Sequence, residues 1–234
     1  MQSVPQNYLK VKITSELSNQ LTKRTSGNRP LLAAGYSLER VIEDIEAIHE
    51  IGRLRVAVWN HAQPQIRADL VKEGMWLESL DYRPNTEHWI VRHKGKVVAS
   101  CRISFHTSTE GVPDSNIMAE FADSNAKLYS SINRLVIHHD HLKKGLSYLL
   151  DHVRLYSAKR KGSTQLFAYA VGEKRSESLA KLGFQKHAEN HGLAILPTID
   201  GPYFALSLDP SKSQLNGEIN NLYLQAASDK KNHS

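Results

Sequence analysis

One segment near the middle of the chain reads Asn133-Arg134-Leu135-Val136-Ile137-His138-His139-Asp140-His141-Leu142-Lys143-Lys144-Gly145-Leu146-Ser147-Tyr148-Leu149-Leu150. Residues 135–137 predict a buried strand, because this apolar run contains two β-branched residues and stops at a polar cluster. The apolar residues from Leu146 to Val153 recur at the spacing of one helical face, which predicts a helix. The segment is therefore interpreted as a strand, a short polar turn and the start of a helix.

The turn before this helix has the features of an anion-binding site. Backbone N–H groups in the first turn of a helix have no partner inside the helix and attract an anion. Gly145 would let the anion approach closely, and Lys143 and Lys144 add positive charge. A phosphate group is the natural candidate, although many turns of this kind bind nothing.

This segment resembles the central motif of the GNAT superfamily, the acyl-CoA-dependent N-acyltransferases. In that family a loop of the pattern Arg/Gln-x-x-Gly-x-Gly/Ala follows the fourth strand and binds the coenzyme A pyrophosphate through its amides. Here Gly145 fills the first glycine position, Ser147 replaces the second small residue, and Leu142 replaces the Arg or Gln. The resemblance implies acetyl-CoA, or another acyl-CoA, as co-substrate. The binding residues that it implies are Leu135, Val136, Ile137, Leu142, Lys143, Lys144, Gly145, Leu146 and Ser147.

A second segment, residues 173–184, is similar to the late helix of the same family, which ends in a Lys-Leu-Gly-Phe type sequence. With the hairpin described below, the resemblance covers most of residues 50 to 208. It implies an α/β fold, the GNAT acyl-CoA N-acyltransferase fold, with a mixed and mostly antiparallel central sheet flanked by helices. We expect an N-terminal extension over residues 1–35, the acyltransferase domain over 36–210 and a polar C-terminal tail over 211–234.

The other expected elements follow from periodicity. Apolar residues near helical spacing predict a first helix from about Leu38 to Val58. A hairpin pairs residues 87–92 with 97–103, and buried strands are expected at 165–171 and 203–208. Residues 106–130 form a long excursion, and loops of this length are usually functional or mobile. We expect this excursion to border the acceptor pocket.

Three residues are candidates for binding the acceptor. Arg55 and Trp59 lie at the end of the first expected helix, where the family often receives its acceptor, and Arg102 lies on a hairpin strand that has one side toward the cleft. The structural alternatives are a surface arginine for Arg55, a core aromatic for Trp59 and a salt-bridged arginine for Arg102. Cys101 alternates to the other face of that strand and is expected to be a small buried residue.

The bulk properties are those of a globular domain with tails. The chain has 234 residues, is 40% hydrophobic and carries a formal net charge of +6, which suits a polyanionic partner such as coenzyme A. It has no dense basic run interleaved with aromatics, so nucleic acid is not expected as a partner. The expected partner is a small-molecule or peptide amine acceptor. The oligomeric state is open and includes a homodimer.

Cysteine usage and hydropathy bear on the compartment. Cys101 is the only cysteine, so an intramolecular disulfide is impossible and a cytoplasmic setting is the simpler reading. The N-terminus lacks the apolar run of a signal peptide, and no stretch approaches the roughly 20 apolar residues of a membrane span. We therefore expect no association with a membrane.

Acyl transfer from a thioester to an amine needs a neutral amine, a carbonyl held close to it and donors for the developing oxyanion. The resemblance implies that backbone amides around Val136 and Ile137 stabilise the oxyanion. The family's usual glutamate base is replaced by Asn133, which cannot act as a base, and its usual tyrosine acid by Leu179. The catalytic groups thus stay open. The candidates are Asn133 for positioning, and His138, Tyr169, Glu87 or water for proton transfer.

Two alternatives compete with acetyl transfer. Arg55, Trp59, Asp81, Arg102 and Arg134 loosely resemble an arrangement in acyl-homoserine-lactone and N-acyl amino acid synthases, which share this fold and take acyl chains from acyl carrier protein. Ser131 stands where those enzymes usually carry a glutamate, which counts against this reading. The second alternative is a non-catalytic domain that binds coenzyme A or a protein partner.

A metal site is not expected. His138, His139 and His141 lie beside Asp140, but residues so close along one turn rarely converge on a single ion.

Overall fold

The computed structural model describes residues 32–62, 71–190, 203–213 and 217–228 of the chain. Most of the expected N-terminal extension, residues 1–31, and the last residues of the expected tail, 229–234, lie outside the described residues. None of the described helices has the length and apolar character needed to cross a membrane.

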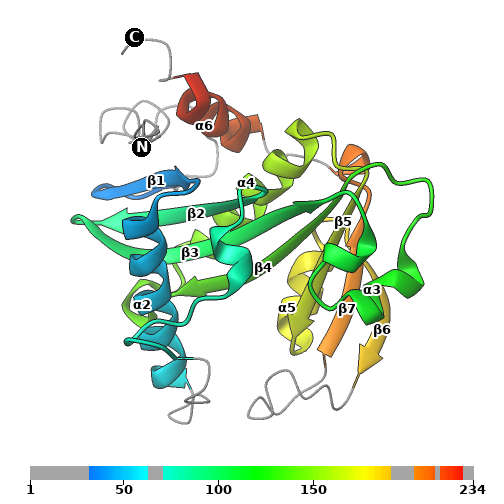
Figure 1. Ribbon diagram of the computed structural model, residues 1–234. Helices are drawn as coiled ribbons and strands as arrows, with labels where there is room; N and C mark the ends of the chain where they lie inside the picture. Colours follow the sequence, from blue (N-terminus) through cyan, green and yellow to red (C-terminus); the bar gives the residue numbers. More distant parts are fainter. Residues whose placement is uncertain (1–31, 63–70, 191–202, 214–216, 229–234) are drawn as a thin grey trace, which may run out of the picture.

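The fold is a mixed, mostly antiparallel sheet flanked by helices, as predicted, and the described residues form seven of its strands (Figure 1). The strands stand in the order β1-β2-β3-β4-β5-β7-β6, and all neighbours are antiparallel except β4 and β5. Their bounds are β1 Tyr36–Val41, β2 Thr86–His93, β3 Lys96–His106, β4 Tyr129–Ile137, β5 Gln165–Val171, β6 Gln185–Asn190 and β7 Tyr203–Leu208. The helices are α2 Ile45–Ala62, α3 Ser115–Met118, α4 Leu146–Arg160, α5 Glu173–Ala180 and α6 Gly217–Ser228.

The first expected helix is wrong in its first part. Residues from Leu38 to Val41 belong to β1, which pairs with β2, and the helix begins only at Ile45. The turn between them contains Glu43 in a left-handed conformation (φ 54°), and the Asp44 carboxylate accepts a hydrogen bond from the Ala47 amide at 3.0 Å. Asp44 therefore caps the helix. The prediction was wrong because the apolar residues before and after this turn happen to follow helical spacing.

Different helices cover the two faces of the sheet. On one face, Leu149, Leu150 and Val153 of α4 pack with Trp89 and Ile219, which brings α6 into the same core. On the opposite face α2 covers β1 and β2, and the segment between β3 and β4, which contains α3, covers β4, β5 and β7. In Figure 1, α2 and α3 lie in front of the sheet and α4 behind it.

The C-terminal part of the chain forms an ordered helix. Ile219 and Tyr223 of α6 are buried against the core, whereas Leu224 is 39% exposed. Residues 217–228 are thus packed on the domain, although sequence composition had placed them in a polar tail. The domain boundaries themselves stay predictions.

Two irregularities in the sheet create the site. The register of β3 against β4 shifts between the pairs Ser100↔Val136 and Arg102↔Asn133, so β4 bulges by one residue. Arg134 lies in this bulge with a φ of 53°. The parallel pairing of β4 with β5 reaches Ile132↔Ala168 and goes no further, so the two strands part beyond these residues.

Candidate functional site

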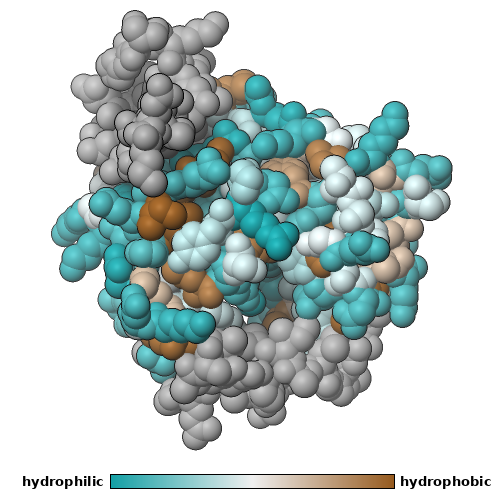
Figure 2. All heavy atoms as spheres, in the orientation of Figure 1, coloured by the Kyte–Doolittle hydropathy of each residue, from teal (hydrophilic) through white to brown (hydrophobic). Residues whose placement is uncertain are grey.

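A cavity of about 650 Å³ opens where β4 and β5 part. It is lined by residues from α2, β3, β4, α4, β5, α5 and β7, and by the segment before β4. Its lining includes the polar and aromatic residues Trp59, Glu78, Arg102, Asp114, Arg134 and Tyr169. The face of the molecule drawn in Figure 2 carries mainly hydrophilic residues around smaller hydrophobic groups.

A buried network of charged side chains builds one wall of this cavity. Asp81 accepts two hydrogen bonds from Arg55, at 2.8 and 2.9 Å, and one from Arg102 at 2.7 Å. Arg102 also donates to Glu78 at 2.8 Å, and Glu78 pairs with Arg134. Four elements are tied together in this way: α2, the short 3₁₀ helix Ser79–Tyr82, β3 and β4.

Electrostatics keep this wall ionised. Burial alone would raise the pKa of Glu78, but the ion pairs with Arg134 and Arg102 outweigh it and lower the pKa from 4.5 to about 2. The pKa of Asp81 is also lowered, because its ion pairs with Arg55 and Arg102 overcome its burial. Three arginines face two carboxylates, so the wall as a whole is cationic.

The three expected acceptor residues occupy different places relative to this wall. Arg55 is fully buried behind it, so the expectation of a surface arginine is wrong. Trp59 and Arg102 line the cavity, and the Trp59 ring packs edge-to-face on Trp76 with centroids 5.5 Å apart. Arg102 is both an ion-paired structural residue and part of the cavity lining.

The expected phosphate loop lies at the start of α4. Lys143 and Gly145 both have left-handed backbones, with φ of 61° and 77°, and no side chain caps the helix. The space beside the Gly145 Cα is open, since a Cβ added there would meet no atom within 4 Å. Leu142, Lys143 and Lys144 are all exposed, and the side chain of Lys144 donates to the Tyr36 hydroxyl at 3.0 Å. Leu146 points into the core, so only its amide is available to an anion.

The central strand supplies the rest of the expected donor site. Leu135 and Val136 line the cavity, and Ile137 packs partly buried against the core beneath α4. These residues directly follow the bulge at Arg134, where the backbone turns away from regular pairing with β3.

Two arginines at the cavity were not found from the sequence. Arg154 of α4 is 1% exposed, donates to the Asn133 carbonyl at 3.3 Å and pairs with Asp151. Arg175 of α5 holds the same Asp151 with two bonds of 2.6 and 2.7 Å. Both arginines line the cavity, and together they tie α4, α5 and β4 around its base. Nothing in the sequence pattern marked either arginine as a cavity residue.

The expected catalytic candidates differ in whether they line the cavity. The Asn133 side chain accepts from Arg102 Nε at 2.6 Å, and Tyr169 lines the cavity with its hydroxyl buried and unbonded among the described residues. His138 is not part of the cavity lining. Glu87 is 1% exposed and pairs with Arg40 and Lys161, away from the cavity lining. Leu179, at the position of the family's tyrosine, is a buried lining residue.

One carboxylate in the cavity was also missed. Asp114 lies in the segment between β3 and β4, which borders the cavity through residues 111–114. Burial raises the pKa of Asp114, the nearby Arg134 opposes the shift and Glu78 adds to it. The local sequence indicated only a turn at Asp114, because this residue lies between Pro113 and Ser115.

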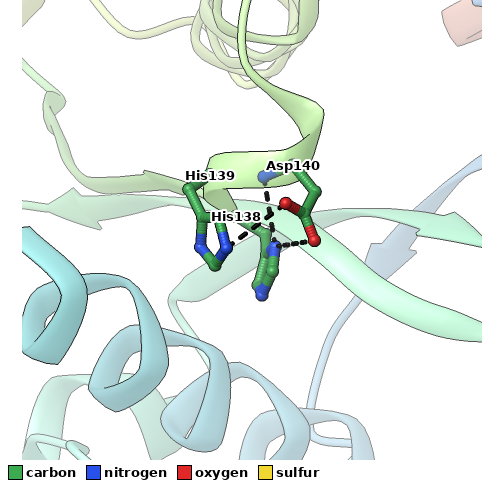
Figure 3. Close-up of side chains that lie close together, drawn as sticks. All are labelled: His138, His139 and Asp140. Carbon is green, nitrogen blue, oxygen red and sulfur yellow. Dashed lines mark hydrogen bonds and ion pairs between the residues drawn. The ribbon is translucent and has the colours of Figure 1, made fainter.

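Among the described residues, one group of three side chains could hold a metal ion (Figure 3). The ligand atoms of His138, His139 and Asp140 lie within 4.8 Å of one another. Asp140 approaches His138 Nδ1 at 3.7 Å and His139 Nε2 at 3.3 Å, and its side chain is 70% exposed. The three residues are consecutive on an exposed turn and do not line the cavity. The absence of a bound metal stays a prediction.

No family model and no curated protein sequence matches the chain. Solved structures do match. FeeM, an N-acyl amino acid synthase from uncultured soil microbes, aligns with 14% identity and a TM-score of 0.57 over 76% of this chain and 92% of its own. BjaI, a CoA-dependent acyl-homoserine lactone synthase with SAM and isopentyl-CoA, aligns with 15% identity and a TM-score of 0.59 over 82% of this chain and 90% of its own.

A third solved structure is an acyl-CoA N-acyltransferase from Pseudomonas aeruginosa. It aligns with 16% identity and a TM-score of 0.53 over 74% of this chain and 98% of its own. The alignments cover nearly the whole of each neighbour, and at these identities the likeness concerns the fold.

Proposed function

We propose that this chain, which has the fold of the GNAT acyl-CoA N-acyltransferases, transfers an acyl group from a coenzyme A thioester to the amine of an acceptor. The observation that carries the proposal is the combination of the bulged β4, its parting from β5 and the uncapped start of α4 in direct succession. A narrow thioester arm fits between parted strands, and a pyrophosphate fits the amides that follow.

The donor would be held mainly by backbone. Amides of residues 146–148 and the open space beside Gly145 suit the pyrophosphate, because free helical N–H groups and the left-handed loop concentrate positive potential there. Val136 and its neighbours on β4 suit the thioester, whose carbonyl oxygen becomes negative during attack and needs donors that are already in place.

The acceptor would enter the side of the cavity lined by Trp59, Glu78, Arg102 and Arg134. This wall is rigid, since its charges are paired with one another, and its net positive charge favours an acceptor that carries a carboxylate or another anionic group. The chain's own contribution to rate would then be positioning of amine and thioester, with oxyanion stabilisation from the strand.

A second candidate function is supported by the same wall. Arg55, Asp81, Arg102 and Arg134 form one continuous network with Glu78, and FeeM and BjaI are among the structural neighbours. An N-acyl amino acid or acyl-homoserine-lactone-type synthase is therefore the second candidate. The carrier-protein donor comes from the sequence resemblance alone, since BjaI is described as CoA-dependent. Ser131, in place of the glutamate of those enzymes, counts against it.

Calorimetric titration of the purified chain with acetyl-CoA and longer acyl-CoAs tests the donor site. Gly145→Glu should abolish binding, because its side chain fills the space beside the loop and repels the pyrophosphate. Gly162→Glu is the matched control: it lies at the other end of α4, with φ of 74° against 77° and equally open space, so it carries the same backbone strain. Equal binding by both variants would contradict the donor site.

A turnover screen then separates the candidates. L-amino acids and small primary amines would be offered with acetyl-CoA, with longer acyl-CoAs and with acyl-loaded acyl carrier protein. Turnover with acyl-CoA supports the first function, and strong preference for the carrier protein supports the second. Tight coenzyme binding without turnover across the panel would identify a non-catalytic domain and overturn both.

A further inference from the structure

Asp114 occupies an unusual position for an aspartate at the start of a helix. It precedes α3 as its N-cap residue, and aspartates there usually accept a hydrogen bond from the first turn. The Asp114 side chain makes no such bond, although its backbone carbonyl accepts from Ile117 and Met118 at 3.0 Å. The carboxylate is therefore not used to cap the helix.

The carboxylate also has no hydrogen-bond or ion-pair partner elsewhere in the described part of the chain. It lies on the lining of the cavity and is partly buried there. The other carboxylates of the site behave differently, since Glu78 and Asp81 each pair with two arginines. The Asp114 oxygens are not among the fully buried atoms that lack a partner, so they stay accessible and can receive a ligand in the cavity.

The groups that face Asp114 come from three elements. Arg134 on β4 and Glu78 before the 3₁₀ helix both act on its charge. Tyr169 on β5 in turn experiences the charge of Asp114, and its buried hydroxyl has no partner among the described residues. Arg134 is already occupied by Glu78 and packs with its guanidinium 4.8 Å from the Trp76 ring centroid. A cationic ligand would satisfy Asp114, and the described chain supplies none.

We infer that Asp114 binds the protonated amino group of the acceptor and removes its proton, so that it replaces the base missing at Asn133. This inference rests on the proposed acyltransferase function and adds the residue that receives the amine. Its geometry is suitable because Asp114, from the segment between β3 and β4, lines the same cavity as residues 132–136 of β4.

The proton and bond changes balance without any further reagent. The Asp114 carboxylate takes one proton from the ammonium group, and the resulting amine attacks the thioester carbonyl carbon to form a C–N bond. The C–S bond then breaks, and the second proton lost by nitrogen passes to the departing thiolate. Asp114 later releases its proton to water, so the products are the amide, free thiol and one proton.

The test compares two small nucleophiles with acetyl-CoA as donor. Methylamine is almost entirely protonated at neutral pH and needs a base, whereas hydroxylamine is neutral and does not. Asp114→Asn should lower the methylamine rate by about a hundredfold, the lower end of general-base effects, and leave the hydroxylamine rate within about twofold. Asp114→Glu should restore part of the methylamine rate. Glu120→Gln, an exposed carboxylate in the same segment, is the control and should change neither rate.

Each other outcome has a definite meaning. Equal losses with both nucleophiles would show that Asp114 only shapes the cavity and would overturn the inference. Unchanged rates with both would overturn it as well, while leaving the proposed function intact. If the unmodified chain bound acetyl-CoA but acetylated neither these two nucleophiles nor any amine of the acceptor panel above, the proposed function and the inference would both fall. Calorimetric binding of acetyl-CoA by Asp114→Asn checks that the donor site stays folded.

Discussion

Arg55 and Asp81 form a two-point ion pair, at 2.8 and 2.9 Å, in which neither side chain has any exposed surface. The pair joins α2 to the 3₁₀ helix Ser79–Tyr82, and Asp81 extends it to Arg102 on β3. Arg55 and Asp81 do not line the cavity, so they hold its wall from behind, through Arg102. Arg55 acts through Asp81 and Arg102, as a positioning residue.

Removing one partner of this pair should destabilise the fold strongly. Arg55→Met keeps most of the side-chain volume but leaves part of the Asp81 charge buried without its partner, and such losses cost about 3–5 kcal/mol. Guanidinium denaturation monitored by circular dichroism measures the change. Arg53→Met, on an exposed position of the same helix, is the control and should shift the free energy of unfolding little. Equal losses in the two variants would contradict a special role for the buried pair.

Acid should weaken the same wall in a defined pH range. The folded pKa of Glu78 is about 2, below its ordinary value of 4.5, so its ion pairs stabilise the fold fully above about pH 4.5. This contribution is lost as the pH falls from 4.5 toward 2. Glu78→Gln should be less stable than the unmodified chain at pH 7, and the difference should shrink and vanish near pH 2. Urea titrations across this range measure it, and a difference independent of pH would refute the linkage.

The fold was largely predictable because its strongest local patterns coincide with its core. Leu146, Leu149, Leu150 and Val153 are buried, as their helical spacing predicted, and Val136 is buried between the partly buried Leu135 and Ile137. The hairpin and the strands at 165–171 and 203–208 form as expected. The error at Leu38–Val41 arose because apolar residues of a strand and of the following helix happened to fall in register across the Asp44 turn. Local spacing cannot reveal that β1 has a partner in β2.

The site was less predictable because it depends on contacts between distant segments. Glu78, Asp114, Arg154 and Arg175 reach the cavity from four separate parts of the chain. Arg175 lies in the segment that resembles the family's late helix, but no spacing marked any of the four as a cavity residue. The bulge at Arg134 and the parting of β4 from β5 are properties of pairing, which a single strand sequence does not encode. The family resemblance located the strand and loop, but it could not show which side chains replace the missing glutamate and tyrosine.

Cys101 should be chemically inert in the folded protein. It is 1% exposed, its thiol lies 3.7 Å from the Leu150 carbonyl, and burial raises its pKa to about 12. Since the thiolate is the reactive form, Ellman's reagent should detect no thiol in the native chain and one thiol per chain after guanidinium unfolding. Rapid labelling under native conditions would mean that β3 and α4 separate readily. Cys101→Ala should retain acyl transfer.

Asn133 should matter more for stability than for rate. Its side chain accepts from Arg102 Nε at 2.6 Å, and Arg102 is 2% exposed, so Asn133→Ala leaves a buried donor unpaired at a cost of about 1–3 kcal/mol. Asn133→Asp keeps an acceptor there and should restore most of the lost stability. The acyl-transfer rate of Asn133→Ala should stay within several-fold of normal, because an amide cannot act as a base. A loss of a hundredfold or more in a folded variant would place Asn133 in the chemistry.

Tyr169→Phe should lower activity without lowering stability. The Tyr169 hydroxyl is buried and has no partner among the described residues, so its removal relieves a desolvation cost and should leave stability unchanged or raise it by up to about 1 kcal/mol. Burial, with the nearby Asp114 and Tyr203, raises its pKa to about 12, so the phenol keeps its proton at every pH used for assay. If this hydroxyl donates to the departing thiolate, its loss should lower kcat by about 10²-fold.

Steady-state assays with acetyl-CoA and methylamine, together with thermal denaturation, measure both effects of Tyr169→Phe. Tyr82→Phe, whose ring is 43% exposed, serves as the control and should change neither. A variant with lower stability and lower activity would indicate that the hydroxyl organises the cavity. A variant with normal kcat would exclude Tyr169 as the acid, and water would then have to protonate the thiolate. Only the combination of retained stability and reduced kcat assigns the proton to Tyr169, because a packing role lowers both quantities together.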